Sequence, residues 1–401
     1  MTLKMSPLMR SRSALNRLWI EERTAMNMSS DGIRKKRSTA RSTGNSTRAD
    51  NTCSAAILTL MSAASSLAKH DKGVSELARV LFIGGTGQIS LPCVAHALAS
   101  GHEVSVFNRG QRGEAVPTGA KSVVGDMNDA ASYARLGQQD WDVVAQFMVF
   151  TPEQMQRDIS IFTGKTGQYI FISSASVYQK SPFAYMTTES TPVRNAYWPY
   201  SQAKIACETM MKASDLPWTN VRPSHTVRTG LPGMVNDGDS DARRMMAGKA
   251  VILAGDGTSL WTLTRAEDLA MPFVGLFGKA AALREDFHIT GDAAFTWDAI
   301  YLTIAKSLGV EVKLVHVPTD TLIRYNSDWI GPLLGDKSWS TLFDNSKIKR
   351  VAGDFACEMD LEKVLSNPIR FFRQRLAANA PGNNALEPLF DRIISEQATL
   401  G

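Results

Sequence analysis

The chain has 401 residues, of which 44% are hydrophobic and 21% are charged, as in an ordinary globular protein. It contains no uninterrupted apolar run long enough to span a membrane, so no transmembrane helix is expected. Residues 1–50 hold 11 Lys or Arg and 4 Asp or Glu, a net charge of +7, which leaves the rest at −2. The overall charge of +5 therefore gives no argument that the body of the chain binds nucleic acid.

Residues 1–77 are rich in Ser, Thr and Arg and show little periodicity, so we predict a disordered basic leader. Three explanations of this leader stay open: an organelle transit segment, a regulatory or nucleic-acid-binding tail, and an upstream extension of the reading frame that is not part of the functional protein. The cysteines are far apart and form no CxxC pair, which predicts neither a metal site nor a disulfide framework. We therefore expect a cytoplasmic protein, or one that reaches an organelle through the leader.

A glycine-rich turn follows the first strand signal. The apolar residues 80–83 run into Gly84-Gly85-Thr86-Gly87-Gln88-Ile89, and a helix is predicted at once over 90–99. Glycines at this place permit a tight turn and let the backbone and the helix N-terminus approach a pyrophosphate. Another strand signal, 103–107, comes about twenty residues later, where a dinucleotide-binding unit places its ribose contact. Dinucleotide binding is the hypothesis that this pattern favours.

Strand and helix signals then alternate. Expected strands are 79–83, 103–107, 122–124, 143–147, 169–172 and 218–221, and expected helices are 90–99, 129–136 and 152–163. This alternation predicts an α/β fold with a doubly wound parallel sheet. We expect a Rossmann domain over 78–222 that also holds the catalytic residues. Residues 223–401, with a strand at 287–290 and helices at 241–247, 265–277, 296–308 and 369–376, should form mainly a smaller substrate-binding domain that can return elements to the Rossmann core.

Hydroxyl side chains gather after the strand at 169–172 and at the start of a predicted helix. Ser173, Ser174 and Ser176 follow the strand, and Tyr200 and Lys204 are four residues apart on one helix face. A lysine beside a phenol favours the phenolate, so such a tyrosine can act as a base nearer neutral pH.

Over residues 79–377 the chain resembles the extended short-chain dehydrogenase/reductase superfamily, in particular the NAD-dependent epimerase/dehydratase family. The resemblance implies that Tyr200 exchanges the hydroxyl proton, that Lys204 lowers the tyrosine pKa and holds the cofactor ribose, and that Ser174 supplies the catalytic hydroxyl. It also implies a cofactor, NAD or NADP, bound by Gly84, Gly85, Thr86, Gly87, Gln88, Ile89, Asn108, Arg109, Asp126, Met127, Phe147 and Met148.

Two departures from the family pattern concern the cofactor. Ser90 replaces the third glycine, and a small residue there still permits close packing of helix and strand. Asn108 replaces an acid that would bind the NAD ribose, and Arg109 follows it, so a 2′-phosphate and hence NADP is possible.

Two further departures concern the reaction. The 4,6-dehydratases of the family carry an Asp-Glu pair where this chain has Ala175 and Ser176, so dehydration of that type is not expected. Trp261 occupies the place of an arginine that holds a nucleotide-sugar diphosphate, and Arg265 would have to compensate from a different position.

We expect substrate contacts from Ser176, His225 and Arg265 and no metal site. The function predicted is hydride transfer at a secondary alcohol of a sugar, a nucleotide sugar or a similar small molecule, by an epimerase or a dehydrogenase/reductase. The alternative is a non-catalytic dinucleotide-sensing or RNA-binding protein that kept the fold, as plant chloroplast stem-loop RNA-binding proteins have done. The resemblance implies a homodimer; no membrane partner, and no nucleic acid for the body, is expected.

Overall fold

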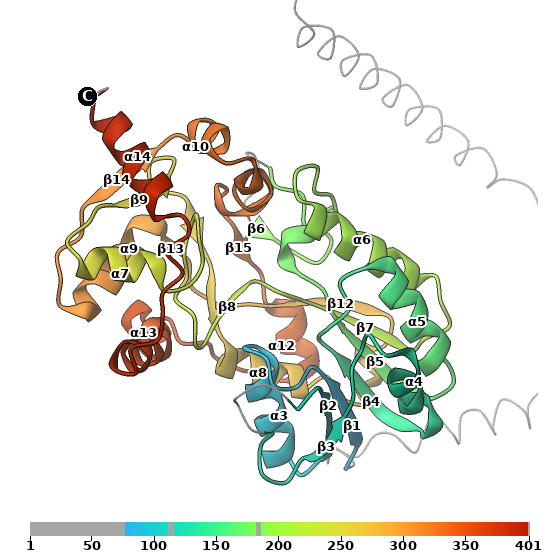
Figure 1. Ribbon diagram of the computed structural model, residues 1–401. Coiled ribbons are helices and arrows are strands. Elements are labelled where there is room, and N and C mark those ends of the chain that lie inside the picture. The colour runs from blue at the N-terminus through green and yellow to red at the C-terminus, as the bar shows by residue number, and fades with distance from the viewer. Residues whose placement is uncertain (1–76, 111–115, 182–185, 400–401) are drawn as a thin grey trace, which may run out of the picture. The chain divides into compact units, whose positions relative to one another are not determined.

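The computed structural model describes residues 77–110, 116–181 and 186–399 (Figure 1). The chain divides into two units, Met1–Gly73 and Val74–Gly401, and the description below concerns the second. The predicted leader, except for its last residue, and Cys53 lie outside the described residues.

Seven parallel strands form the central sheet (Figure 1). In spatial order they are β12 (Glu285–Ile289), β7 (Trp218–Pro223), β5 (Thr166–Ile172), β4 (Trp141–Gln146), β1 (Arg79–Ile83), β2 (Glu103–Asn108) and β3 (Lys121–Val124). The strand order reverses between β1 and β4, where a doubly wound sheet opens a crevice at the carboxyl ends of its strands. The predicted α/β fold class is confirmed.

Alternate residues of β1 enter two different cores, because successive side chains of a strand point to opposite faces. Val80 and Phe82 pack with α3 (Ser90–Ala99), α8 (Ala266–Val274) and α12 (Ser346–Ala352). Leu81 and Ile83 pack on the other face with α5 (Pro152–Phe162) and α6 (Pro199–Lys212). The short helix α4 (Ala130–Ala134) joins this second core through the buried Tyr133. All four β1 residues are at most 1% exposed, as expected for a strand that is covered on both faces.

A third core lies in the C-terminal part of the chain. Its helices are α7 (Ser240–Met246), α9 (Trp297–Leu308), α10 (Thr319–Tyr325), α11 (Ile330–Pro332), α13 (Leu361–Ala377) and α14 (Glu387–Ala398). Three small two-stranded sheets join them: β9 (Val251–Ala254) with β14 (Leu314–Val317), β8 (His225–Val227) with β11 (Leu263–Arg265), and β10 (Leu260–Trp261) with β13 (Phe295–Thr296). A fourth such sheet, β6 (Met186–Thr187) with β15 (Leu342–Phe343), contributes no residue to this core. The strand β12 and the helices α8 and α12 also come from this half of the sequence but belong to the Rossmann part.

The predicted elements of the Rossmann part agree closely with the structure, and β1 and α3 have the expected bounds. The expected helix 129–136 is divided into α4 and a 3-10 turn over Arg135–Gln138. The expected helix 369–376 is only the second half of α13. Among the described helices, none is both long and apolar enough to cross a membrane.

Candidate active site

The glycine turn after β1 is closed by a serine. Ser90 Oγ accepts a hydrogen bond from the Gly87 N–H at 2.9 Å and donates one to the Gly84 carbonyl oxygen at 2.6 Å. Gly84 has a positive φ of 84°, and a Cβ atom there would lie 2.4 Å from Met148 Cγ. Ser90, which replaces the third glycine of the motif, therefore bridges both ends of the turn. The missing Cβ of Gly84 lets Met148, in the chain after β4, approach the turn closely.

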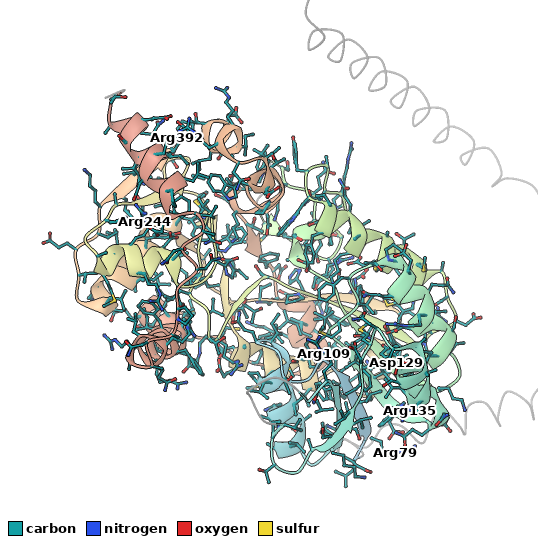
Figure 2. All side chains as sticks on the ribbon, in the orientation of Figure 1. Arg79, Arg109, Asp129, Arg135, Arg244 and Arg392 are labelled. Atoms are coloured by element: carbon teal, nitrogen blue, oxygen red, sulfur yellow. The ribbon has the colours of Figure 1, made fainter. Side chains whose placement is uncertain are left out.

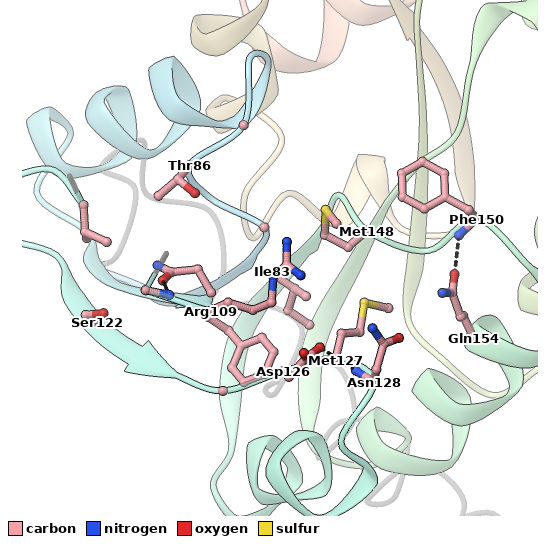
Figure 3. Close-up of a pocket in the computed structure, with 17 residues that line it drawn as sticks. Ile83, Thr86, Arg109, Ser122, Asp126, Met127, Asn128, Met148, Phe150 and Gln154 are labelled. Carbon is pink, nitrogen blue, oxygen red and sulfur yellow. Dashed lines mark hydrogen bonds between the residues drawn. The ribbon is translucent and has the colours of Figure 1, made fainter. Parts of the chain in front are cut away.

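A cavity of about 440 Å³ lies at the carboxyl ends of β1, β2, β3 and β4 (Figure 3). Eight of the predicted cofactor residues line it: Gly84, Thr86, Gly87, Asn108, Arg109, Asp126, Met127 and Met148. Its position at the reversal of strand order is where this class of sheet binds a dinucleotide. The Asn108 amide nitrogen at its edge is buried without a hydrogen-bond partner among the described residues, so the cavity offers a donor that a bound group can satisfy.

Four predicted cofactor residues do not line this cavity: Gly85, Gln88, Ile89 and Phe147. A Cβ on Gly85 would lie 2.9 Å from Val106 Cγ1, so this glycine serves close packing of helix and strand. The Gln88 side chain instead donates to the Thr226 carbonyl oxygen and accepts from the Thr229 hydroxyl and the Gly230 N–H. These bonds hold the glycine turn to the C-terminal half of the sequence. The remaining two, Ile89 and Phe147, pack against the core beneath the cavity.

The structure adds lining residues that sequence reasoning missed, notably Ser122, Phe150 and Gln154 (Figure 3). Gln154 Oε1 accepts hydrogen bonds from the backbone of Phe150 and of Thr151, the cap of α5. The sequence Thr-Pro-Glu-Gln at the start of α5 is a capping-box signal that would have placed Gln154 beside this loop.

Ser174, Tyr200 and Lys204 come together at the ends of β5 and α6. Tyr200 and Lys204 lie on successive turns of α6, which begins at Pro199. Ser174 follows β5, and its hydroxyl lies near enough to Tyr200 to act on the pKa of the phenol. Lys204 Nζ lies 5.9 Å from the centroid of the Tyr200 ring and 4.5 Å from that of Phe150, which lines the 440 Å³ cavity. The ammonium therefore lies between that cavity and the tyrosine.

Lys204 is almost fully buried and its ammonium is held by backbone oxygens. Nζ donates to the carbonyl oxygen of Val149 at 2.6 Å and to that of Ile172 at 2.8 Å. Burial lowers the pKa of Lys204 to about 8, and Cys207 and Glu208 act weakly in the opposite direction. The ammonium is thus cationic at neutral pH, with one N–H left after the two carbonyl bonds.

The predicted lowering of the Tyr200 pKa is not found. Burial raises the pKa of Tyr200 above its usual range, the Ser174 hydrogen bond opposes this, and the charge of Asp336 adds to it. The Lys204 ammonium donates to two carbonyl oxygens and forms no hydrogen bond with the phenol oxygen. In this structure Tyr200 is a phenol that keeps its proton.

A second cavity, of about 260 Å³, opens in front of Ser174 and Tyr200. Ser176 and His225, two of the predicted substrate residues, line it. The Ser176 hydroxyl lies 2.8 Å from that of Ser174 and 2.7 Å from that of Ser201, so it belongs to a chain of hydroxyls that orients Ser174. Aromatic side chains supply much of the remaining wall: Trp198, Tyr200, Trp261 and Phe343.

The tautomer of His225 follows from its partner Trp261. Trp261 Nε1, which can only donate, lies 2.9 Å from His225 Nδ1, so Nδ1 is the acceptor and the ring proton is on Nε2. Burial lowers the pKa of His225 to about 4; the Asp237 charge opposes this and Lys337 adds to it. His225 is therefore a neutral N–H donor at physiological pH.

Both lysines in the described lining of this cavity are paired with carboxylates. Lys180 Nζ lies 2.7 Å from Asp336 Oδ1, and Lys337 Nζ lies 2.9 Å from both oxygens of Asp237. Arg265 does not line the cavity, and its guanidinium lies 3.7 Å from Asp268. The expectation that Arg265 contacts the substrate is not supported by this placement, because its charge is engaged at the start of α8.

Across the described residues, no group of three or more His, Cys, Asp or Glu side chains is arranged to hold a metal ion. The three described cysteines are free and buried.

Comparison with known proteins agrees with this geometry. Residues 84–247 match a family model described as NAD(P)H-binding. The chloroplast stem-loop binding protein of 41 kDa b from Arabidopsis thaliana is 26% identical over 59% of this chain, and the match spans 65% of that relative. The 2′-dehydrokanamycin reductase of Streptomyces kanamyceticus is 22% identical over 80% of this chain and 93% of its own length.

Among solved structures, the epimerase Mth375 from Methanothermobacter thermautotrophicus superposes with a TM-score of 0.61 and 16% identity, over 76% of this chain and 94% of that one. The NAD(P)H-binding match and the shared fold thus agree with the resemblance to the extended short-chain dehydrogenase/reductase superfamily: the chain has an NAD(P)H-binding domain, with NAD or NADP as cofactor, and the fold of the solved epimerase.

Proposed function

We propose that the chain is an NAD(P)-dependent oxidoreductase or epimerase that transfers hydride at a secondary alcohol or ketone of a sugar-like molecule. The observation that carries this proposal is the place of Lys204, between the 440 Å³ cavity and the Tyr200 phenol that lines the 260 Å³ cavity. Bound NAD(P) supplies the hydride donor or acceptor.

In the proposed mechanism Tyr200 gives its proton to the carbonyl oxygen during reduction. Its raised pKa suits it as an acid, and the Ser174 hydroxyl, oriented by Ser176, hydrogen-bonds the same oxygen. Lys204 directs its remaining N–H to the cofactor ribose, and its charge stabilises the phenolate left on Tyr200.

We further propose that the substrate has no diphosphate. A diphosphate needs unpaired cations, whereas the lysines in the described lining, Lys180 and Lys337, are already paired with carboxylates. Trp261 and the neutral His225 offer instead an aromatic wall and an N–H donor, which suit the apolar faces and hydroxyls of a sugar ring. Dehydration of the 4,6 type is not part of the proposal, because Ala175 and Ser176 supply no carboxylate.

The test is consumption of NADPH or NADH, followed by cofactor fluorescence, with the full chain and a panel of ketoses, oxidised glycosides and UDP-sugars. Turnover of a member that carries no diphosphate, with UDP-sugars inert, is the expected result. Turnover of UDP-sugars alone would contradict the proposed substrate class.

The Arabidopsis relative, named for stem-loop binding, makes RNA the alternative ligand to examine. A salt-dependent shift of a stem-loop RNA by the full chain, together with failure to bind either cofactor, would overturn the enzyme proposal in favour of that alternative. Homodimerisation, and location in the cytoplasm or in an organelle reached through the leader, also remain proposals; size-exclusion chromatography and a tagged full-length chain test them.

A further inference from the structure

A buried carboxylate is connected through one side chain to the loop that joins β4 to α5. Asp158 on α5 is 0% exposed and lines neither the 440 Å³ nor the 260 Å³ cavity. Tyr133 Oη donates to its Oδ1 at 2.8 Å. Tyr169 Oη and Gln146 Nε2 donate to its Oδ2 at 2.7 and 2.5 Å. Three donors surround the group, so the site suits an ionised carboxylate, which accepts only.

Gln146, the last residue of β4, joins this carboxylate to the loop. The Met148 N–H lies 2.7 Å from Gln146 Oε1, and because a backbone N–H can only donate, the amide oxygen faces the loop. The amide nitrogen therefore faces Asp158, and its other hydrogen is donated to Tyr133 Oη, 2.9 Å away. Every polar group of this fully buried side chain is thus engaged. The orientation of the amide, and with it the bond to Met148, depends on the carboxylate.

The loop that Gln146 holds serves both the cofactor cavity and Lys204. Met148 and Phe150 line the 440 Å³ cavity (Figure 3). Val149, between them, supplies the carbonyl oxygen to which Lys204 Nζ donates at 2.6 Å. A shift of this loop would therefore change the cofactor cavity and the place of the ammonium together.

The charge of Asp158 depends on pH. Burial raises the pKa of Asp158 to about 6, while its three hydrogen bonds and the charge of the neighbouring Arg157 oppose this. Among the described residues, the titratable groups that other elements turn toward it are Tyr133 of α4, Tyr169 of β5 and, acting on Tyr169, Cys207 of α6. Protonation would bring a fourth hydrogen among three donors, so one of the hydrogen bonds would have to be given up.

We propose that Asp158 is a positioning residue: through Gln146 it holds the loop between β4 and α5 in the arrangement that binds the dinucleotide and anchors Lys204. The ionised carboxylate, which makes the full set of hydrogen bonds, is the form that supports binding. The inference rests on the proposed function only in that the 440 Å³ cavity holds the cofactor.

The experiment measures dissociation constants of NAD⁺ and NADP⁺ for the full chain by isothermal titration calorimetry, and the cofactor that binds more tightly serves for all comparisons. At about pH 7.5, Asp158→Asn should weaken binding by about tenfold, because the new amide N–H₂ meets the donors that surround it. At about pH 5 the unmodified chain is itself mostly protonated at Asp158, so the ratio of the two constants should shrink to about twofold. Any ionisation of the cofactor is common to both proteins and cancels in this ratio.

Two further variants separate positioning from a general loss of stability. Gln146→Leu removes the connection and keeps the carboxylate, so it should weaken binding as Asp158→Asn does, and the double variant should lose less than about twofold more. Tyr169→Phe removes a hydrogen bond to the same carboxylate but keeps the connection. It should lower the melting temperature and change the dissociation constant less than about twofold.

Asp142→Asn is the matched control for the substitution itself. Asp142 also belongs to β4, but it lies near the start of the strand, where its carboxylate is beside Arg79 (Figure 2) and outside the cavity lining. Its replacement should leave the dissociation constant and its pH dependence unchanged.

Cofactor binding by Asp158→Asn as tight as that of the unmodified chain would overturn the inference. An equal loss in Tyr169→Phe would do the same, because lowered stability would then be the cause. So would a ratio that is the same at both pH values, because the charge of Asp158 would then have no part in binding. If circular dichroism shows that Asp158→Asn does not fold, Gln146→Leu supplies the same ratio. Failure of the unmodified chain to bind either cofactor would instead overturn the proposed function.

Discussion

Burial acts on Tyr200 and Lys204 in opposite directions. It raises the pKa of the phenol and lowers the pKa of the ammonium to about 8, because both groups lose water around their charged forms. At neutral pH the pair is therefore a protonated acid beside a cation. The sequence predicts that these residues share a helix face, but a sequence contains no measure of burial, and so it gave the wrong direction for the tyrosine.

Replacing Tyr200 by Phe should remove the proton donor and keep the ring. We expect the hydride-transfer rate to fall by about 10²- to 10⁴-fold, the range typical of a lost general acid, with the cofactor dissociation constant nearly unchanged. Single-turnover cofactor fluorescence measures the rate. Tyr197→Phe, at a tyrosine that is 51% exposed, is the matched control, and an equal loss there would contradict the assignment.

The pH dependence of reduction should be set by Lys204. Its lowered pKa means that the cation is present below about pH 8 and is lost as the pH rises through that value. The reduction rate should be level from about pH 6 to 7, fall to about half near pH 8 and decline further above it. His225, with a pKa of about 4, should add no step near pH 6.5. A step there in the pH–rate profile would show that His225 titrates in the working range.

At the scale of elements, a buried ion pair fixes the helix that carries the proposed catalytic pair. Arg222 on β7 is 1% exposed and forms two hydrogen bonds, of 2.9 and 2.6 Å, with the carboxylate of Glu208 on α6. It also contacts the Tyr178 hydroxyl and Asp286. The ion pair between Arg222 and Glu208 links α6 to the sheet one helical turn beyond Lys204.

Glu208→Ala should destabilise the protein by about 3–5 kcal/mol, because it leaves the Arg222 charge buried without its main partner. Urea unfolding followed by circular dichroism measures the free energy. The neighbouring Lys212→Ala, which removes a partly exposed partner of Asp286, should cost less than about 1 kcal/mol. Similar losses for the two variants would show that the pair does not anchor α6.

Some elements could be predicted from the sequence and others could not. The difference is whether the pattern that defines an element lies within one short stretch of the chain. The strand β1, the glycine turn and α3 follow one another, so pattern and turn chemistry suffice to predict them. The sheet of β9 and β14 pairs Val251 with Leu314, more than sixty residues later, and each strand has four residues. No local period identifies such short strands as a pair.

At the scale of the whole described body, the 260 Å³ cavity is completed by residues far apart in the sequence. Asn195 donates to the Gly335 carbonyl oxygen at 2.8 Å, and Lys180 pairs with Asp336. The sequence predicts the chemistry of Ser174 and Tyr200 because they lie on strong local motifs. It could not predict Asp336 and Lys337, which lie on a π-helical turn over Leu333–Lys337.

Asp336→Asn should leave the Lys180 cation unpaired in the cavity. We expect the variant to bind UDP-glucose at least about tenfold more tightly than the unmodified chain, since an unpaired ammonium attracts the diphosphate. Calorimetric titration with UDP-glucose measures the change. Asp320→Asn, on α10 and outside the cavity lining, is the control. Tight binding of UDP-glucose by the unmodified chain would contradict the argument from paired charges.

The stacked indoles of Trp261 and Trp297 beside His225 allow ligand binding in the 260 Å³ cavity to be followed by tryptophan fluorescence. Trp261 lines the cavity, and Trp297, which is fully buried, stacks on it with ring centroids 5.4 Å apart. Indole emission depends on the polarity around the ring, so a molecule that displaces water from Trp261 shifts the emission of the stacked pair. Candidate ligands can therefore be screened by intrinsic fluorescence, without a label and before any turnover assay exists. Comparison with Trp261→Phe separates this signal from that of the other tryptophans among the eight in the chain.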